Sequence, residues 1–123
     1  HTRFKAMEIR GRDTVTGMPR TVEITAREVN AALAEPLQVI VEAIKSCLEV
    51  APPELAADII EQGITLTGGG ALLYGLDKLV SRETRLPAQV AEDPMGVVAA
   101  GTGKIAENLG KMRRVLVASS KQK

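Results

Sequence analysis

Several residue types that build common functional sites are scarce in this 123-residue sequence. It contains one cysteine, one histidine and no tryptophan, and its aromatic content is 2%, from Phe4 and Tyr74. One histidine at the first position and one cysteine cannot make a zinc site or a hydrolytic triad. With two aromatic side chains, the sequence also lacks the stacking platforms of single-stranded nucleic-acid binders. We therefore expect no metal centre and no nucleic-acid partner.

The sequence also has no large excess of positive or negative charge and no long apolar run. Sixteen Lys and Arg residues against 15 Asp and Glu leave a formal net charge of +1, so no global field attracts an anionic partner. No apolar run approaches the ~20 residues that span a bilayer. The single cysteine, Cys47, cannot form an intramolecular disulfide and lies in an apolar helical pattern. We expect it in the core of a protein from a reducing, cytoplasmic compartment.

The rest of the composition is that of a globular protein, 45% hydrophobic and 25% charged, in a chain long enough for one domain. Its first 25 residues predict a hairpin of two strands, Phe4–Arg10 and Thr21–Thr25, because apolar and β-branched residues there flank turn-forming ones. The expected connection is a long loop that contains Gly11, Asp13, Gly17 and Pro19.

Helices are predicted to follow the hairpin. Thr25 and Glu28 match a capping box, in which the Thr hydroxyl and the Glu carboxylate satisfy the free N–H groups of a helix start. Pro36 cannot donate a hydrogen bond, so we expect one helix to end at Glu35 and a second to begin at Pro36. The second helix should turn one apolar face to the core, formed by Leu37, Ile40, Val41, Ile44, Cys47 and Leu48.

The middle of the chain predicts a helix, a strand and a glycine loop. Pro53 at a first helical position opens a helix over Glu54–Gln62, which Gly63 ends. Ile64–Thr67 predicts a short buried strand that runs directly into three glycines at 68–70. From the residues alone, two interpretations stay open: a tight strand-to-helix turn, or a set of backbone N–H groups that binds phosphate or ribose.

The remaining residues predict further elements, namely an exposed helix over Leu76–Arg85, a short strand over Ala88–Ala91 and a last helix over about Met95–Leu109, which Asp93 and Pro94 introduce. Two glycines inside that last helix, Gly101 and Gly103, cost about 1 kcal/mol each relative to alanine. They predict a close approach of the helix to another segment. From Gly110 on the chain is basic, and both a frayed tail and a weak interaction segment remain open.

No motif for catalysis is complete in the sequence. Gly103 and Lys104 look like the end of a phosphate-binding P-loop, but the glycine and the Ser or Thr required at two other positions are absent. Glu92 and Asp93 are adjacent carboxylates that point in different directions, and Asp93 is explained as a helix N-cap. Nothing else places a general base beside a nucleophile.

Three longer stretches carry a resemblance to a known family. They are GRDTVTGMPRTVEIT at 11–25, PPELAADIIEQGITLTGGGALLYGLDKL at 52–79 and AEDPMGVVAAGTGKIAEN at 91–108. Together they resemble the C-terminal part of the bacterial actins of the MreB and Mbl family, over about Met7 to Leu109. The middle stretch is the most specific of the three.

This resemblance favours the nucleotide interpretation of the glycine loop, because the loop corresponds to the adenosine motif of the family. By resemblance, the residues that line an ATP cleft are Gly68, Gly69, Gly70, Ala71 and Leu72. ATP with Mg²⁺ is implied for the full-length family. The family's phosphate loops and catalytic glutamate have no counterpart in this sequence, so for this chain alone we expect weak binding or none, and no ATP hydrolysis.

The implied fold is α/β, the actin-like ATPase fold of ribonuclease-H-like type, of which this chain is the C-terminal half with subdomain IIA and part of IIB. Residues 1–25 then correspond to the end of the subdomain IIB hairpin and residues 26–92 to subdomain IIA. Residues 93–110 correspond to the helix that connects to subdomain IA, and residues 111–123 form a basic tail.

The implied function is that of a cytoskeletal protein whose cytoplasmic, membrane-associated filaments determine cell shape by guiding cell-wall synthesis. The implied partners are further copies in a protofilament, the remaining actin-like subdomains, and proteins of cell shape and wall synthesis. Membrane contact is implied only through family regions absent here. A different class stays open, a truncated actin-like module that caps or modulates filaments without ATPase activity. The chain begins with His1, and both a natural truncation and an excised fragment fit that beginning.

Overall fold

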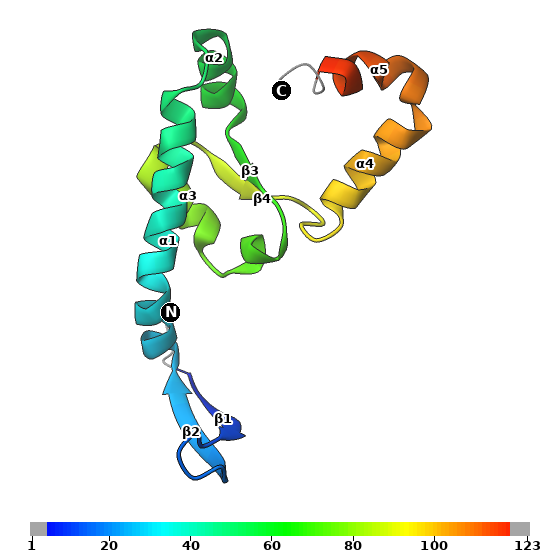
Figure 1. Cartoon of the computed structure of the whole chain (residues 1–123). Coiled ribbons are helices and arrows are strands. Elements are labelled where there is room, and N and C mark those ends of the chain that lie inside the picture. Colours follow the sequence, from blue (N-terminus) through cyan, green and yellow to red (C-terminus); the bar gives the residue numbers. More distant parts are fainter. Residues whose placement is uncertain (1–4, 119–123) are drawn as a thin grey trace. The chain divides into compact units, whose positions relative to one another are not determined.

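A computed structural model of the protein describes the backbone of residues 5–118 and the side chains of residues 5–114. The chain divides into two compact units, His1–Cys47 and Leu48–Lys123, which are described separately. Figure 1 shows the elements of both units in chain order. They are β1 (Ala6–Arg12), β2 (Pro19–Thr25), α1 (Ala26–Glu49), α2 (Pro53–Gln62), β3 (Ile64–Leu66), the 3₁₀ turn η1 (Gly69–Leu72), α3 (Leu76–Thr84), β4 (Ala88–Val90), α4 (Val97–Glu107) and α5 (Leu109–Ala118).

The first unit begins with the expected hairpin. β1 and β2 pair antiparallel, with Met7 opposite Ile24 and Ile9 opposite Val22. Since successive residues of a strand alternate between faces, these four apolar residues share one face of the ribbon. The strands reach further into the predicted loop than expected, and the connection is correspondingly shorter. Phe4, expected to open the first strand, lies outside the described residues.

The capping box forms as predicted and opens α1. The Glu28 carboxylate accepts hydrogen bonds from the Thr25 N–H at 2.7 Å and from the Thr25 hydroxyl at 2.9 Å. In return the Glu28 N–H donates to the Thr25 hydroxyl oxygen at 3.2 Å. This reciprocal pairing satisfies donors that have no partner within the first turn.

The predicted break at Pro36 is wrong, because α1 continues through it as one helix of 24 residues. A proline in a helix interior removes one backbone hydrogen bond and costs about 3 kcal/mol, but it ends a helix only when nothing else supports the turns on either side. Pro36 is exposed, so water can reach the carbonyl that loses its donor. The capping box before it and the apolar stripe after it stabilise both halves.

The apolar stripe of α1 is narrower than predicted, and the placement of Cys47 in the core is wrong. Val41 is buried, and Leu37, Ile44 and Leu48 are half-buried. Cys47 is exposed. Each residue turns a helix by roughly 100°, which places Cys47 about 120° around the axis from Val41, at the margin of the stripe. Ile40, also predicted to face the core, lies at the same margin and is 46% exposed.

The second unit contains a parallel pair of short strands joined through a helix. β3 and β4 pair with Ile64 opposite Ala88 and Leu66 opposite Val90, and the chain crosses between them through η1 and α3. Both predicted strands are thus confirmed. α3 is not the fully exposed helix that was predicted, because Leu76 and Val80 are buried. A parallel connection needs such a crossover, and α3 packs against β4.

Gly63 joins α2 to the strand pair. It ends α2 as predicted, with φ of 75° and its N–H bonded to the Ile59 carbonyl oxygen. The next N–H, that of Ile64, donates to the Pro87 carbonyl oxygen at 2.7 Å, which brings the starts of β3 and β4 together. A Cβ on Gly63 would meet that same carbonyl oxygen. The position therefore requires glycine for its conformation and for space.

The end of the chain differs from the prediction. The expected last helix forms as α4, close to its predicted bounds, and a further helix, α5, follows it in the segment from Gly110 on, for which a frayed tail was one interpretation. Residues 119–123 lie outside the described residues. A Cβ on Gly101 or Gly103 would meet nothing within 4 Å. The close approach predicted from these glycines is thus not made within the described part of the chain.

Candidate functional site

The glycine loop lies at the carboxyl end of β3, where the sequence predicts it. Gly68 has φ of 83° and ψ of 176°, a conformation that is essentially restricted to glycine. Its N–H donates to the Pro94 carbonyl oxygen, with an N–O distance of 2.6 Å. Pro94 belongs to the segment between β4 and α4, so this bond ties the start of the loop to the approach of the last helices.

The loop then makes a single 3₁₀ turn, η1, instead of starting the next helix directly. The Ala71 N–H donates to the Gly68 carbonyl oxygen at 3.2 Å, and the Leu73 N–H to that of Gly70 at 3.1 Å. Ala71 is buried and Leu72 is 63% exposed. α3 begins only at Leu76, so Ala71 and Leu72 belong to the 3₁₀ turn and not to that helix.

The surface beside η1 is built of backbone. The N–H groups of Gly69 and Gly70 open the turn and have no acceptor inside it. A Cβ on Gly70 would project into open space, whereas one on Gly69 would lie 3.3 Å from the Met95 sulfur. A phosphate or ribose could therefore approach the backbone at Gly70 without meeting a side chain. Any other residue at this position would place a Cβ in that space.

Asp93 organises the turn that leads into α4, although the N-cap of that helix is Gly96 and not Asp93, the residue that the sequence predicts. Its carbonyl oxygen accepts from the Val97 N–H at 3.0 Å, and its carboxylate accepts from the Gly96 N–H at 3.2 Å. A Cβ on Gly96 would meet that carboxylate. A side chain at position 96 would therefore displace the Asp93 carboxylate from the Gly96 N–H. The same turn carries Pro94 and Met95 to the glycine loop.

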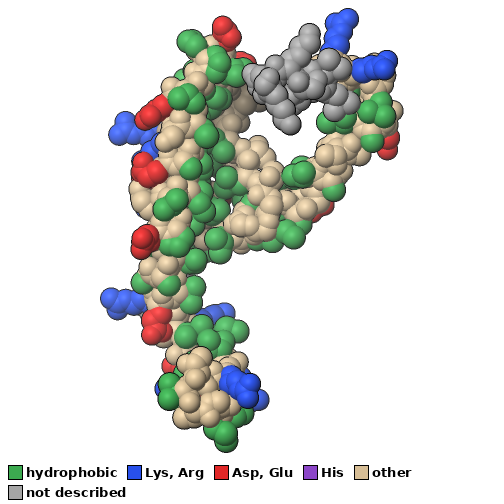
Figure 2. Space-filling view, viewed as in Figure 1, with side chains coloured by type: hydrophobic (Ala, Val, Ile, Leu, Met, Phe, Trp, Pro, Cys, Tyr) green, Lys and Arg blue, Asp and Glu red, His purple; other side chains and the backbone are tan. Residues whose placement is uncertain are grey.

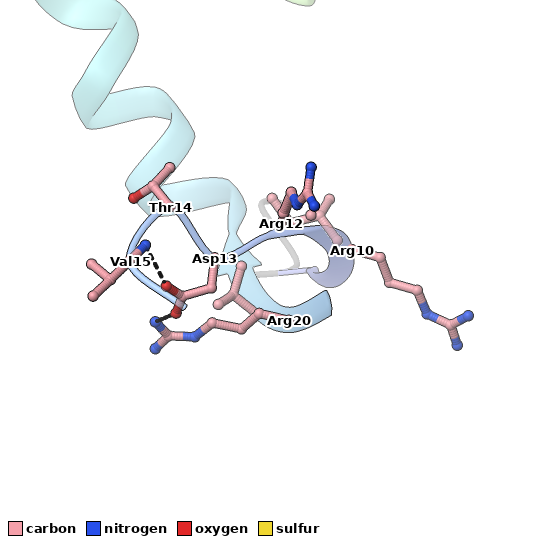
Figure 3. A pocket seen from close by; sticks show the side chains of 9 residues that line it. Arg10, Arg12, Asp13, Thr14, Val15 and Arg20 are labelled. Carbon is pink, nitrogen blue, oxygen red and sulfur yellow. Dashed lines mark hydrogen bonds and ion pairs between the residues drawn. The ribbon is translucent and has the colours of Figure 1, made fainter. Parts of the chain in front are cut away.

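A second feature, not predicted from the sequence, is a hollow of about 360 Å³ at the tip of the hairpin (Figure 3). The directly paired Ile9 and Val22 line it together with Gly11, which shares their face of the ribbon and has no side chain to fill the space. The rest of its lining consists of Arg10, Arg12, Asp13, Thr14, Val15 and Arg20. The signal in the sequence was the glycine inside the first strand, which the prediction had assigned to the loop.

Asp13 holds the tip of the hairpin together. Its carboxylate accepts from the N–H groups of Val15 at 2.8 Å and Thr16 at 3.0 Å, and it pairs with Arg20 at 3.3 Å. Figure 3 shows Asp13 between Val15 and Arg20, with the Arg10 side chain extending away from them. The N–H of Thr16, then that of Val15 and the Arg20 guanidinium, lower the pKa of Asp13 below its ordinary value of 3.8.

The described residues, 5–118, lack both a metal-ligand cluster and a membrane-spanning helix. These described residues contain no group of three His, Cys, Asp or Glu side chains that could hold a metal ion. They accordingly offer no ligand set for Mg²⁺. No helix in the same part of the chain is long and apolar enough to cross a membrane.

The fold has solved counterparts. The chain aligns over 93% of its length with MreB5 of Spiroplasma citri in crystal structures bound to ADP and to AMPPNP, with TM-scores of 0.81 and 0.80 and 34% sequence identity. It covers 35% and 34% of those two chains. The strand, glycine loop and helix arrangement is therefore part of an actin-like ATPase fold, as the sequence resemblance predicted.

Sequence comparison narrows this class to one family. The model of the MreB/Mbl protein family matches residues 1–114, and the chain belongs to this family. It is 52% identical over 110 residues to the cell shape-determining protein Mbl of Bacillus subtilis (strain 168), covering 89% of this chain and 33% of that protein. It is 50% identical over 103 residues to the cell shape-determining protein MreB of Escherichia coli (strain K12), covering 84% of this chain and 30% of that protein. The chain thus spans about a third of the length of these curated relatives.

Proposed function

We propose that this chain is the C-terminal part of an actin-like, ATP-binding cytoskeletal protein that polymerises into membrane-associated filaments and determines cell shape by guiding cell-wall synthesis. The observation that carries the proposal is the family match over residues 1–114, with relatives named for cell-shape determination. Its partners would be further copies of the protein, the remaining actin-like subdomains, and proteins of cell shape and wall synthesis. Its location would be the cytoplasm beneath the membrane.

The nucleotide contact would be the glycine loop. Gly68, Gly69 and Gly70 would present backbone N–H groups to the nucleotide, with Ala71 packed beneath the turn and Leu72 at its open side. Two observations support this role. Family members with the same fold are solved with ADP and AMPPNP, and the Gly70 side of the turn is open. The ligands of Mg²⁺ and the groups that stabilise charge on the γ-phosphate would come from outside residues 5–118.

The same family correspondence divides the chain. Residues 1–25 would end the hairpin of subdomain IIB, residues 26–92 would form subdomain IIA, and residues 93–110 would connect to subdomain IA. The bond between Gly68 and Pro94 supports a mechanical role for this connection, because it joins the glycine loop directly to the approach of α4. Residues 111–123, beyond the connecting helix, form the basic tail.

Isothermal titration calorimetry with ATP and Mg²⁺ tests the nucleotide contact. The informative variant is Gly70→Val, because its side chain would occupy the open space beside η1 without a clash inside the chain. Gly11→Val is the matched control, since the Cβ of Gly11 also projects into open space but lies in the hairpin. We expect binding heat from the unmodified chain and from Gly11→Val, and its loss in Gly70→Val.

Equal heat from all three proteins would contradict the role of the glycine loop. No heat from any of them would mean that the chain has no nucleotide half-site of its own. That outcome would favour the second candidate, a module that joins or caps filaments without ATPase activity.

A further inference from the structure

Two of the three glycines in the loop are not explained by their backbone conformation. Gly68 has a positive φ, whereas Gly69 and Gly70 do not. Residues with a side chain can adopt negative φ without strain, so these dihedral angles do not require glycine at positions 69 and 70. What a glycine provides at these two positions is therefore the space that a Cβ would otherwise fill.

At Gly69 this space is taken by the side chain of Met95. A Cβ on Gly69 would lie only 3.3 Å from the Met95 sulfur. The turn between β4 and α4 holds Met95 there from both sides. Before it, the Pro94 carbonyl oxygen accepts from the Gly68 N–H at 2.6 Å, and after it, the next N–H donates to the Asp93 carboxylate at 3.2 Å. The thioether therefore lies against the glycine loop because of contacts within the chain itself.

At Gly70 the space is open. A Cβ there would meet no atom of the described chain within 4 Å. Consecutive Cα atoms are about 3.8 Å apart, less than the length of a nucleotide. A nucleotide that occupies the space at Gly70 is therefore long enough to reach the side chain that lies on Gly69. Hydrophobic side chains lie along the segment that joins β4 to α4 and carries Met95 (Figure 1, Figure 2).

We propose that Met95 contacts the base of a bound nucleotide, with its thioether against one face of the ring. A thioether is apolar and polarisable and makes favourable contacts with aromatic rings, whereas it offers no donor to a phosphate. The Asp93 carboxylate, two positions away, would also repel a phosphate but not a neutral base. The base would then lie at Met95, and the sugar and phosphates would extend past Gly70.

This proposal rests on the proposed nucleotide contact of the glycine loop, and it adds a side chain and an orientation to that contact. It also states what Met95 does not do. A thioether has no hydrogen-bond donor and is a weak acceptor, so it cannot read the polar edge of a base. Met95 should therefore favour any nucleotide over a ligand without a base, and it should contribute equally to ATP and GTP.

Methyl NMR of the chain with ¹³C-labelled methionine tests the contact. The chain has four methionines, and the signal that disappears in Met95→Leu belongs to Met95. We expect ATP with Mg²⁺ to shift this methyl signal upfield, because atoms over the face of an aromatic ring are shielded. Ribose 5-triphosphate, which is ATP without its base, should cause no upfield shift. Met7 and Met18, both in the hairpin, are internal controls whose signals should not move.

Affinities measured from the Gly70 amide signal add an energetic test. Loss of a contact between a thioether and an aromatic ring in Met95→Ala should weaken the binding of ATP and of GTP roughly two- to tenfold and leave that of ribose 5-triphosphate unchanged. Met95→Leu should retain most of the affinity, because leucine keeps an apolar side chain of similar volume. Met18→Ala is the matched control, which removes the same side chain from the hairpin and should bind like the unmodified chain.

The possible failures have different patterns. An ATP-dependent shift of the Gly70 amide without an upfield shift of the Met95 methyl would overturn the proposal and leave the contact of the glycine loop intact. Equal weakening of ATP and ribose 5-triphosphate in Met95→Ala would also overturn it, since Met95 would then only support the loop. If ATP moves neither signal, the contact of the glycine loop itself fails, and the base contact fails with it.

Discussion

The hairpin tip and the glycine loop are both tight turns that contain a glycine with positive φ, yet they are held in opposite ways. At the tip, the Asp13 carboxylate satisfies the N–H groups of Val15 and Thr16 within its own turn. In the glycine loop no side chain does this. The loop is held by the bond from Gly68 to Pro94, 26 positions further along the chain.

This difference in how the N–H groups are paired indicates which of the two turns can bind a ligand. Because backbone N–H groups are costly to leave without a partner when they are buried, a turn either pairs them itself or keeps them available to something else. The hairpin tip pairs them through Asp13 and is structurally complete. The glycine loop leaves the first N–H groups of η1 on an open surface, which is why we place the nucleotide contact there and not at the hollow of the hairpin.

The largest expected effect is at Gly68. Gly68→Ala forces a side chain into φ of 83° and ψ of 176°, and strain of this kind costs about 1–3 kcal/mol. We expect the free energy of unfolding, measured by urea denaturation, to fall by that amount. Gly70→Ala is the control, because the Cβ there meets nothing and no positive φ is involved. An equal loss of unfolding free energy in Gly68→Ala and Gly70→Ala would show that the backbone conformation of Gly68 is not the cause of the loss.

A smaller effect is expected at Asp13. Asp13→Ala removes the acceptor of two N–H groups and the partner of Arg20, so the tip should loosen while the glycine loop stays unchanged. Faster amide hydrogen exchange at Val15 and Thr16 would report this. Thr14→Ala provides the comparison inside the same turn. If Asp13→Ala leaves exchange at the tip unaltered, the turn does not depend on its carboxylate.

The two turns should also respond differently to acid. The pKa of Asp13 is lowered in the folded chain, mainly by the N–H of Thr16. Its contribution to stability is therefore complete above the ordinary value of 3.8 and is lost as pH falls through the lower folded value. The NMR amide signals of Val15 and Thr16 should shift in that acidic range. In Asp13→Asn this pH dependence should disappear, and its persistence would assign the titration to another group.

The smallest effect is expected at Gly11, beside the hollow. Its Cβ would project into open space and its φ is not in the left-handed region, so Gly11→Ala should stabilise the strand by roughly 0.5 kcal/mol. Gly17→Ala, at φ of 71°, should destabilise the same hairpin. Thermal unfolding of the two variants gives the comparison. Destabilisation by Gly11→Ala would mean that something occupies the hollow in solution.

The local features of the chain could be predicted because neighbouring residues decide them. The Thr25–Glu28 capping box, the Gly63 helix end and the start of α2 at Pro53 all formed where the sequence placed them. Both strand regions around the glycine loop were correct for the same reason. The role of the glycine loop came from the family resemblance, and its contact with nucleotide remains a prediction.

The errors include local ones, such as the break at Pro36, and others that concern which side chains are buried. The low helix propensity of proline predicted a break at Pro36, but α1 is continuous. The capping box before Pro36 and the apolar stripe after it stabilise the helix on both sides. Periodicity placed Cys47 on the core face, but the buried stripe of α1 is narrower than the apolar pattern, and Cys47 is exposed. The helix over Leu76–Arg85 was predicted to be exposed, but Leu76 and Val80 are buried, and α3 packs against β4.

The sequence by itself therefore determined the Thr25–Glu28 capping box, the start of α2 at Pro53 and its end at Gly63, since these depend on dihedral angles and on hydrogen bonds between near neighbours. Only the tertiary structure decided that β3 pairs with β4 in parallel and that the Gly68 N–H reaches Pro94. Such pairings close long loops at an entropic cost that no local pattern records. They form because the strands and α3 bury their apolar residues together.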